Sequence, residues 1–178
     1  MASPMIAKEL QATLRKAFDR AGFMRHEYVT LEHLLLALTE DPKAAAALEA
    51  CSVDVKRLRR ELEAFIQEQL TRLPESVTVE PRQTLAVERV LQRAAIHAIS
   101  SEMKTIDGGN VLVQLLKEEE SYAAYLLQQE GLSAFELKRY IAHGGGTDII
   151  PGEDDGYTDA GFEEEEDEGL GGRDPLEA

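Results

Sequence analysis

The sequence has one cysteine, no tryptophan and no long hydrophobic run, and each shortage excludes a class of protein. The single cysteine, Cys51, excludes an internal disulfide framework and a cysteine-based zinc cluster. The longest aliphatic run, residues 34–38, is far shorter than the ~20 residues needed to cross a bilayer. The first residues also lack the basic region and apolar core of a secretory signal. These shortages favour a cytoplasmic protein without a membrane partner.

Basic residues are scarce relative to acidic ones, and the imbalance is concentrated at the carboxyl end. The chain has 19 Lys/Arg and 34 Asp/Glu in 178 residues, a formal net charge of −15. Residues 1–143 carry 18 Lys/Arg and 21 Asp/Glu, net −3, whereas residues 144–178 carry one Arg and 13 Asp/Glu, net −12. Because no segment has the positive surplus that phosphate neutralisation requires, a nucleic-acid partner is excluded. The like charge and low hydrophobicity of 144–178 predict a disordered acidic tail.

The body of the chain shows a helical period and little β-branched density. Apolar residues three and four apart recur throughout, and Thr30 and Thr84 are suited to cap the helices that follow them. The helices are expected to start near residues 10, 31, 43, 54, 84, 111, 122 and 134. Two prolines and an alternating pattern in 71–83 predict a connector, and Asp107-Gly108-Gly109 is interpreted as a turn. The pattern therefore predicts an all-α fold of about eight helices.

The helical pattern occurs twice. At a constant offset of 77 residues the aligned pairs are Leu10 with Val87, Leu34 with Val111, and Ala46-Ala47 with Ala123-Ala124. At an offset of 79, Leu58 aligns with Leu137. Two copies are too few for a solenoid, so each half must bury the apolar face of the other. We predict two four-helix repeats, about 5–70 and 84–142, related by a pseudo-twofold axis in one compact domain, 1–143.

Residues with catalytic potential are few. His26-Glu27 resembles the start of HExxH, but Thr30 occupies the place of the second histidine. No phosphate-binding loop and no nucleophile with a partner base is present, so no catalytic residue is predicted and the chain is not expected to be an enzyme. One alternative function is a metal site formed by His26, Glu32, His33 and His97. The other interpretation of these histidines is that they cap helices or pack at their starts.

Three polar side chains lie at or just after predicted helix starts and are expected to be exposed. Glu32 suits the positive end of its helix dipole, Thr84 starts the corresponding helix of the second repeat, and Arg89 follows it. If the repeats pack about a pseudo-twofold axis, these helix starts share a surface. The alternative is ordinary capping and surface charge.

The residues also resemble a known family. The segment Thr-Leu-Glu-His-Leu-Leu-Leu-Ala-Leu at 30–38, together with the doubled four-helix pattern, resembles the Clp amino-terminal (Clp R) domain. Finer matches resemble the ClpA branch, whose members are AAA+ unfoldases of the ClpAP protease. They are found at 26–30, 47–54, 60–66, 89–94 and 110–113. The resemblance covers residues 5–143.

This resemblance implies a domain that receives substrate proteins and docks ClpS, the adaptor for N-degron substrates. It implies adaptor contacts at Glu32, Thr84 and Arg89. It also implies that 144–178 is a linker ending where the first AAA+ module would begin. ATP, Mg²⁺ and the ClpP peptidase would then be engaged only by the ATPase ring of a hexameric parent. The domain itself is expected to be a monomer without a cofactor. A stand-alone relative that sequesters adaptors is a further alternative.

The sequence departs from the family pattern in two places. Gln83 precedes Thr84 where relatives often have proline, and the proline here is Pro81. Relatives that recognise phosphorylated arginine use a glutamate in each repeat, whereas the 77-offset counterpart of Glu32 is Gly109. Paired recognition of phosphoarginine is therefore not expected.

Overall fold

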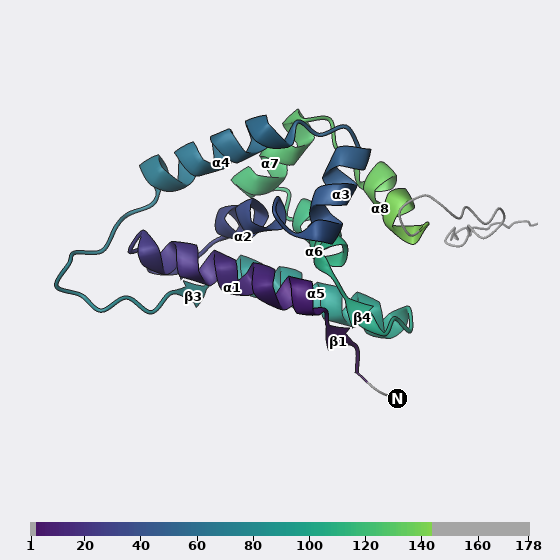
Figure 1. Cartoon of the computed structure of the whole chain (residues 1–178), viewed down its shortest axis with the longest axis horizontal. Helices are drawn as coiled ribbons and strands as arrows, with labels where there is room; N and C mark the ends of the chain where they lie inside the picture. Colours follow the sequence, from purple (N-terminus) through teal and green to yellow (C-terminus); the bar gives the residue numbers. More distant parts are fainter. Residues whose placement is uncertain (1–2, 144–178) are drawn as a thin grey trace, which may run out of the picture. The chain divides into compact units, whose positions relative to one another are not determined.

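Eight helices and four two-residue strands make up residues 3–143, the part of the chain that the computed structural model describes (Figure 1). The helices are α1 (Lys8–Phe23), α2 (Leu31–Leu38), α3 (Pro42–Ala50), α4 (Val55–Gln69), α5 (Leu85–Ser100), α6 (Gly108–Leu116), α7 (Tyr122–Gln129) and α8 (Ala134–Ala142). The strands are β1 (Met5–Ile6), β2 (Tyr28–Val29), β3 (Arg82–Gln83) and β4 (Thr105–Ile106). The predicted all-α class is confirmed, while the predicted acidic tail, 144–178, lies outside the described residues. None of these helices is long and apolar enough to cross a bilayer.

Side-chain caps explain where most of these helices begin. In front of each helix from α2 to α8, a side-chain oxygen accepts a hydrogen bond from a backbone N–H of the first turn, which stabilises a helix by about 1 kcal/mol. The capping residues are Thr30, Asp41, Asp54, Thr84, Asp107, Ser121 and Ser133. The predicted caps Thr30 and Thr84 are thus confirmed.

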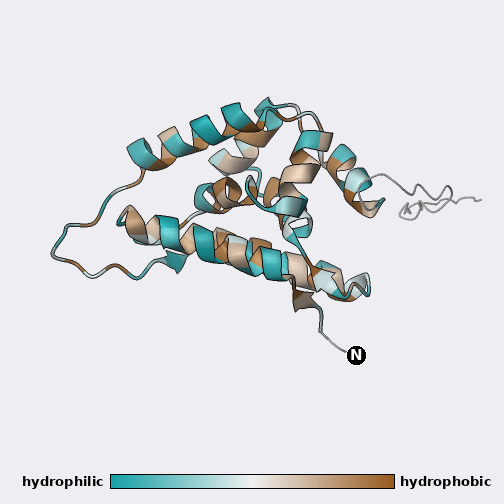
Figure 2. Cartoon of the chain, in the orientation of Figure 1, coloured by the Kyte–Doolittle hydropathy of each residue, from teal (hydrophilic) through white to brown (hydrophobic). Residues whose placement is uncertain are grey.

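The core is built around α2 and α6. Every residue of α2 is buried, and so are most residues of α6. The surrounding helices turn one apolar stripe toward this pair and their polar residues outward, as the hydropathy colouring of α1 and α4 shows in Figure 2. Each repeat therefore contributes one central helix that the other helices cover.

The four strands show how the two halves are related. β1 pairs in parallel with β4, and β2 pairs in parallel with β3. At the offset of 77, β1 corresponds to β3 and β2 to β4, since 82 − 5 and 105 − 28 are both 77. In each pair, the first strand of one repeat lies beside the second strand of the other repeat. A pseudo-twofold axis requires this arrangement. The strands were not predicted because two residues carry no detectable period.

Left-handed backbone residues repeat in the same way and also correct the alignment. Arg25 and Glu102, with φ of 60° and 56°, are 77 residues apart, whereas Ser52 and Gly131, with φ of 65° and 86°, are 79 apart. The loop before α7 is two residues longer than the loop before α3, so the offset changes there. The predicted pairing of Ala46-Ala47 with Ala123-Ala124 is therefore wrong, and the buried Ala44 is the counterpart of Ala123.

The interpretation of Asp107-Gly108-Gly109 as a turn is also wrong. Asp107 caps α6, and both glycines belong to its first turn. A Cβ at Gly108 would lie well inside van der Waals contact with the carboxylate of Asp41, which caps α3. The glycine is therefore needed for the close approach of two helices, and a sequence pattern does not distinguish this from a turn.

The connector between α4 and β3 is attached to the end of α1. The Arg25 side chain donates hydrogen bonds to the carbonyls of Leu73, Pro74 and Val77, and Leu73 N donates back to the Arg25 carbonyl over 2.8 Å. Figure 1 shows this connector as the long loop that leads from α4 back to β3. Arg25 thus sets the path by which the second repeat is entered.

Candidate functional site

Glu32 lies in the first turn of α2 and joins the two repeats. Its Oε2 accepts a hydrogen bond from the backbone N–H of Ala123, over 2.9 Å, at the start of α7. A carboxylate in this place is stabilised by the positive end of the α7 dipole. The residue is only 8% exposed, so the predicted exposure of Glu32 is wrong. The reason is that the start of α7, 91 residues away in sequence, packs over it.

Thr84 is held beside the start of α2 by the pairing of β2 with β3. Its N–H donates to the Val29 carbonyl over 3.1 Å, and its hydroxyl accepts from Val87 N over 3.2 Å. The side chain is partly exposed. The backbone bonds from β3 to β2 come from the N–H groups of Arg82 and Thr84 and leave out that of Gln83. Neither bond uses the N–H of residue 83, so a proline there and the glutamine found here are both compatible with them. Thr84 therefore keeps its capping position despite the departure from the family pattern.

Arg89 presents a fixed guanidinium on α5. It pairs with Glu118 through two hydrogen bonds, Nε to Oε2 at 3.0 Å and Nη2 to Oε1 at 2.7 Å. Arg93 Nη2 lies 2.9 Å from Glu118 Oε2. The hydrogen bonding from Arg89, and to a lesser degree that from Arg93, holds the pKa of Glu118 below its ordinary value. Because 53% of the Arg89 side chain stays exposed, its position is set while much of its surface remains accessible.

Two of the three predicted residues contact the segment that leads into α7, and the third lies beside the start of α2. Arg89 contacts Glu118 at one end of this segment, and Glu32 contacts Ala123 at the other. Thr84 starts α5 beside β2, which leads directly into α2. Arg89 is exposed and Thr84 partly exposed, whereas the Glu32 carboxylate is buried against the start of α7. We name this surface, defined by Glu32, Thr84, Arg89 and residues 118–123, the α7-entry surface.

His26 and His33 do come together, as a buried pair. Thr30 N lies 2.9 Å from His33 Nδ1 and must be the donor, so the proton of His33 is on Nε2. That nitrogen lies 3.0 Å from His26 Nδ1 and donates to it, leaving the His26 proton on the buried Nε2. Burial, together with the nearby His26 and Arg20, lowers the pKa of His33 to about 4. Both rings are thus neutral at neutral pH, and His33 closes the cap of α2.

The structure brings together only His26 and His33 of the four residues of the metal-site alternative. Glu32 points to the start of α7, and His97 lies exposed on α5. Within residues 3–143, no three His, Cys, Asp or Glu side chains gather at one point. The arrangement that the alternative needs is therefore not formed by these side chains.

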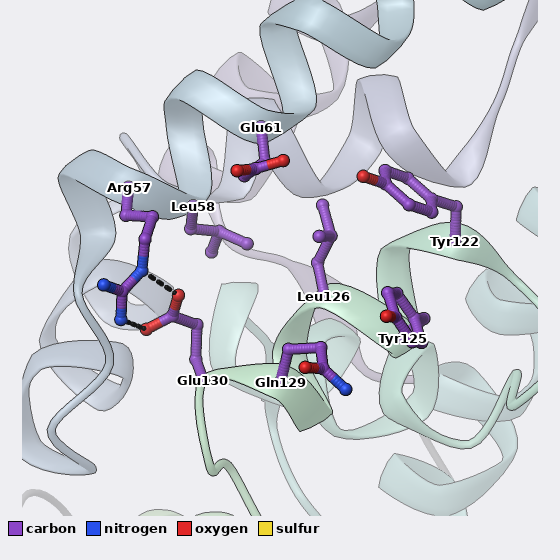
Figure 3. A pocket seen from close by; sticks show the side chains of 8 residues that line it. All are labelled: Arg57, Leu58, Glu61, Tyr122, Tyr125, Leu126, Gln129 and Glu130. Atoms are coloured by element: carbon purple, nitrogen blue, oxygen red, sulfur yellow. Dashed lines mark hydrogen bonds and ion pairs between the residues drawn. The ribbon is translucent and has the colours of Figure 1, made fainter.

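A second surface was missed from the sequence. A groove runs between α4 and α7 (Figure 3). Its walls carry Tyr122 and Tyr125 from α7, and at the offset of 79 the counterparts of these tyrosines in α3 are Lys43 and Ala46. Tyrosines at surface positions of one repeat, where the other repeat has lysine and alanine, are the sequence signal that would have indicated this groove. It was missed because the sequence alignment used the wrong offset in this helix.

Comparison with known proteins gives one family. Residues 5–130 match the family described as the Clp repeat (R) N-terminal domain. A protein named "ClpA homolog protein", from Fuscovulum blasticum, is 43% identical over 151 residues, which make up 84% of this chain and 19% of that protein. The chain thus spans about a fifth of the length of this relative.

Solved structures show the same fold. The Hsp104 N-terminal domain from Candida albicans has a TM-score of 0.65 at 14% identity, covering 79% of this chain and 93% of that one. The N-terminal domain of ClpD from Arabidopsis thaliana has a TM-score of 0.57 at 16% identity, covering 78% and 93%. A complex of the ClpV N-domain with a VipB peptide has a TM-score of 0.63 at 20% identity, covering 77% and 84%. At these identities the likeness concerns the fold alone.

Proposed function

The chain belongs to the Clp repeat N-terminal domain family, and from this membership we propose that it docks adaptors and substrate proteins for a ClpA-like ATP-dependent unfoldase. The part that the structure describes is this N-terminal domain rather than an ATPase module. The 43% identity to a protein named as a ClpA homolog supports the branch. The proposed adaptor is of the ClpS type, and the proposed role is N-degron degradation in the cytoplasm. ATP, Mg²⁺, hexamer formation and contact with ClpP are assigned by this proposal to the rest of a longer parent.

The arrangement of Arg89 supports the adaptor role most directly. A guanidinium already held by two hydrogen bonds loses little conformational entropy when a partner binds, and its planar donors suit a partner's carboxylate. The rest of the α7-entry surface is equally fixed, since Glu32 and Thr84 are hydrogen-bonded to backbone. We therefore expect an adaptor to present an acidic side chain to Arg89 and to lie across the start of α5.

Replacing Arg89 by alanine is expected to weaken binding of purified ClpS by roughly 30-fold, as the loss of about 2 kcal/mol at an interface arginine implies. Isothermal titration calorimetry measures this. The matched control is Arg57→Ala, because Arg57 forms the same two-bond ion pair with Glu130 and its side chain is also 53% exposed, but it lies on α4. The control should bind ClpS as the wild type does.

Glu32 gives a second, separable variant. Glu32→Ala leaves the buried Ala123 N–H without its acceptor, whereas Glu32→Gln keeps an acceptor oxygen there. If Glu32 acts through the position of α7, the glutamine variant binds ClpS better than the alanine variant. Wild-type affinity in the Arg89→Ala/Glu32→Ala double variant, with its helicity retained, would contradict the proposed adaptor surface.

A further inference from the structure

The groove between α4 and α7 has an apolar floor and closed ends. Its volume is about 400 Å³, within the range of about 300–1,000 Å³ common for ligand sites. Leu58 of α4 and Leu126 of α7 form the floor. In Figure 3 the ion pair between Arg57 and Glu130 closes one end, and the rings of α7 stand at the other. The groove thus has two nearly buried leucines at its base, and polar groups make up most of its accessible lining.

The aromatic wall is a stack of three rings that ends in solvent. Phe65 of α4 stacks on Tyr122 with 4.4 Å between ring centroids, and Tyr122 stacks on Tyr125 with 5.8 Å between centroids. Tyr125 is 49% exposed, so one end of the stack is accessible. The face of an aromatic ring carries negative potential and attracts cations. A cation is therefore favoured at this end of the groove.

The charges of the groove favour the same kind of ligand. Arg57 and Glu130 neutralise each other through bonds of 2.7 and 3.0 Å. Glu61, which points into the groove in Figure 3, takes part in none of the ion pairs formed within residues 3–143. Its negative charge adds to burial in raising the pKa of Tyr122. Glu61 thus lies beside electron-rich rings, and the cation whose charge acts on it, Arg57, is already paired with Glu130.

The duplication supplies an internal comparison for these positions. At the offset of 79, the counterparts of Glu61, Tyr125 and Gln129 are Tyr140, Ala46 and Ala50 on α8 and α3. The same two-helix packing therefore forms with a tyrosine in place of the Glu61 carboxylate and with alanines in place of Tyr125 and Gln129. The fold therefore does not require the side chains that give this groove its character.

We propose that this groove binds an extended segment of a partner protein that presents a lysine or arginine next to an apolar residue. The long aliphatic stem would cover Leu58 and Leu126, and the cationic head would lie between the Glu61 carboxylate and the Tyr125 ring. The inference rests on the proposed protein-docking role but uses a surface that shares only Tyr122 with the α7-entry surface. It names a substrate chemistry for that role, namely basic and apolar residues side by side.

The test uses two peptides that differ in one charged group. Both are acetylated and amidated, carry an uncharged dye, and have a Leu-Lys-Leu or Leu-norleucine-Leu centre between glycines and serines. Norleucine keeps most of the lysine stem without its ammonium group. By fluorescence polarisation, the lysine peptide should bind the domain about fivefold more tightly than the norleucine peptide, and added salt should remove most of the difference.

Groove variants then locate the site. Glu61→Gln should remove the preference for lysine and leave norleucine binding unchanged, whereas Tyr125→Ala, which installs the residue of the other repeat, should weaken both peptides. Arg89→Ala is the control and should bind both peptides as the wild type does, even though its binding of ClpS is expected to be weaker. One outcome would contradict the groove proposal and leave the adaptor proposal standing. In it, Arg89→Ala binds ClpS more weakly than the wild type does, and the wild-type domain binds neither peptide.

Three other outcomes overturn the inference. They are equal affinity for both peptides, no binding at millimolar peptide, and self-association of the domain that Tyr125→Ala abolishes. The last outcome would assign the groove to a second copy of the chain. A circular dichroism spectrum like that of the wild type, measured for each variant, shows that a loss of binding is not a loss of fold.

Discussion

Gly108→Ala is expected to lower the free energy of unfolding by about 3 kcal/mol. The added methyl group would overlap the buried carboxylate of Asp41. That carboxylate accepts hydrogen bonds from the Thr13 hydroxyl at 2.7 Å and from the backbone N–H groups of Lys43 and Ala44 at 3.0 Å. The domain must either move the carboxylate and weaken these bonds or separate α6 from α3. Urea unfolding followed by circular dichroism measures the loss.

The neighbouring glycine provides the matched control. A Cβ at Gly109 would meet the Ile141 Cδ1 methyl at 3.2 Å and Asp107 Oδ1 at 3.3 Å, and the flexible methyl can give way. Both substitutions gain the same helix propensity, so Gly109→Ala should change stability little. In the double variant with Asp41→Ala, the cost of Gly108→Ala should shrink, because the carboxylate is gone. Equal stability of the two alanine variants would show that the Asp41 contact does not constrain α6.

The free energy of unfolding is expected to fall as the pH drops below about 6.5, before most carboxylates are protonated. The pKa of His33 is about 4 in the fold and 6.5 when unfolded, because burial disfavours the charged ring. Below pH 6.5 the unfolded chain binds a proton that the folded chain does not, so the free energy of unfolding falls as pH falls. The full contribution is present above pH 6.5 and is lost by about pH 4, a difference of roughly 3 kcal/mol.

The second repeat suggests the variant that checks this. The counterpart of His33 is Asn110, whose Oδ1 accepts from Asp107 N over 2.8 Å in an equivalent capping box. His33→Asn should therefore keep an acceptor for Thr30 N without a titrating group. Urea unfolding between pH 7 and 4.5 should show a much flatter dependence in this variant, while His97→Asn on the exposed face of α5 should behave as the wild type. A parallel decline in His33→Asn would assign the acid sensitivity to other groups.

Local features were predicted from the sequence because they depend on near neighbours. The caps Thr30 and Thr84 and the apolar stripes of the helices follow from contacts three or four residues apart. The repeat was found for the same reason, since two copies of a local pattern can be aligned without a structure. The alignment failed beyond α2, because the loop after α6 is two residues longer than the loop after α2 and changes the offset to 79.

Of the candidate site, the sequence indicated the residues but not their surroundings. Whether Glu32, Thr84 and Arg89 contact an adaptor stays a prediction. The structure shows instead that Arg89 is already paired with Glu118 and that Glu32 is buried at the start of α7. The groove beside Tyr125 was not found, because it needs two helices that are far apart in sequence.

The sequence by itself determined the helices, most of their starts, the duplication and the family. Only the tertiary structure decided that Glu32 faces inward, that Gly108 makes room for Asp41, and that β1 and β2 pair with strands of the other repeat. Helix starts and apolar stripes are set by interactions within one or two turns. Burial and exposure are set by which distant segment packs against a residue, and that depends on the whole fold.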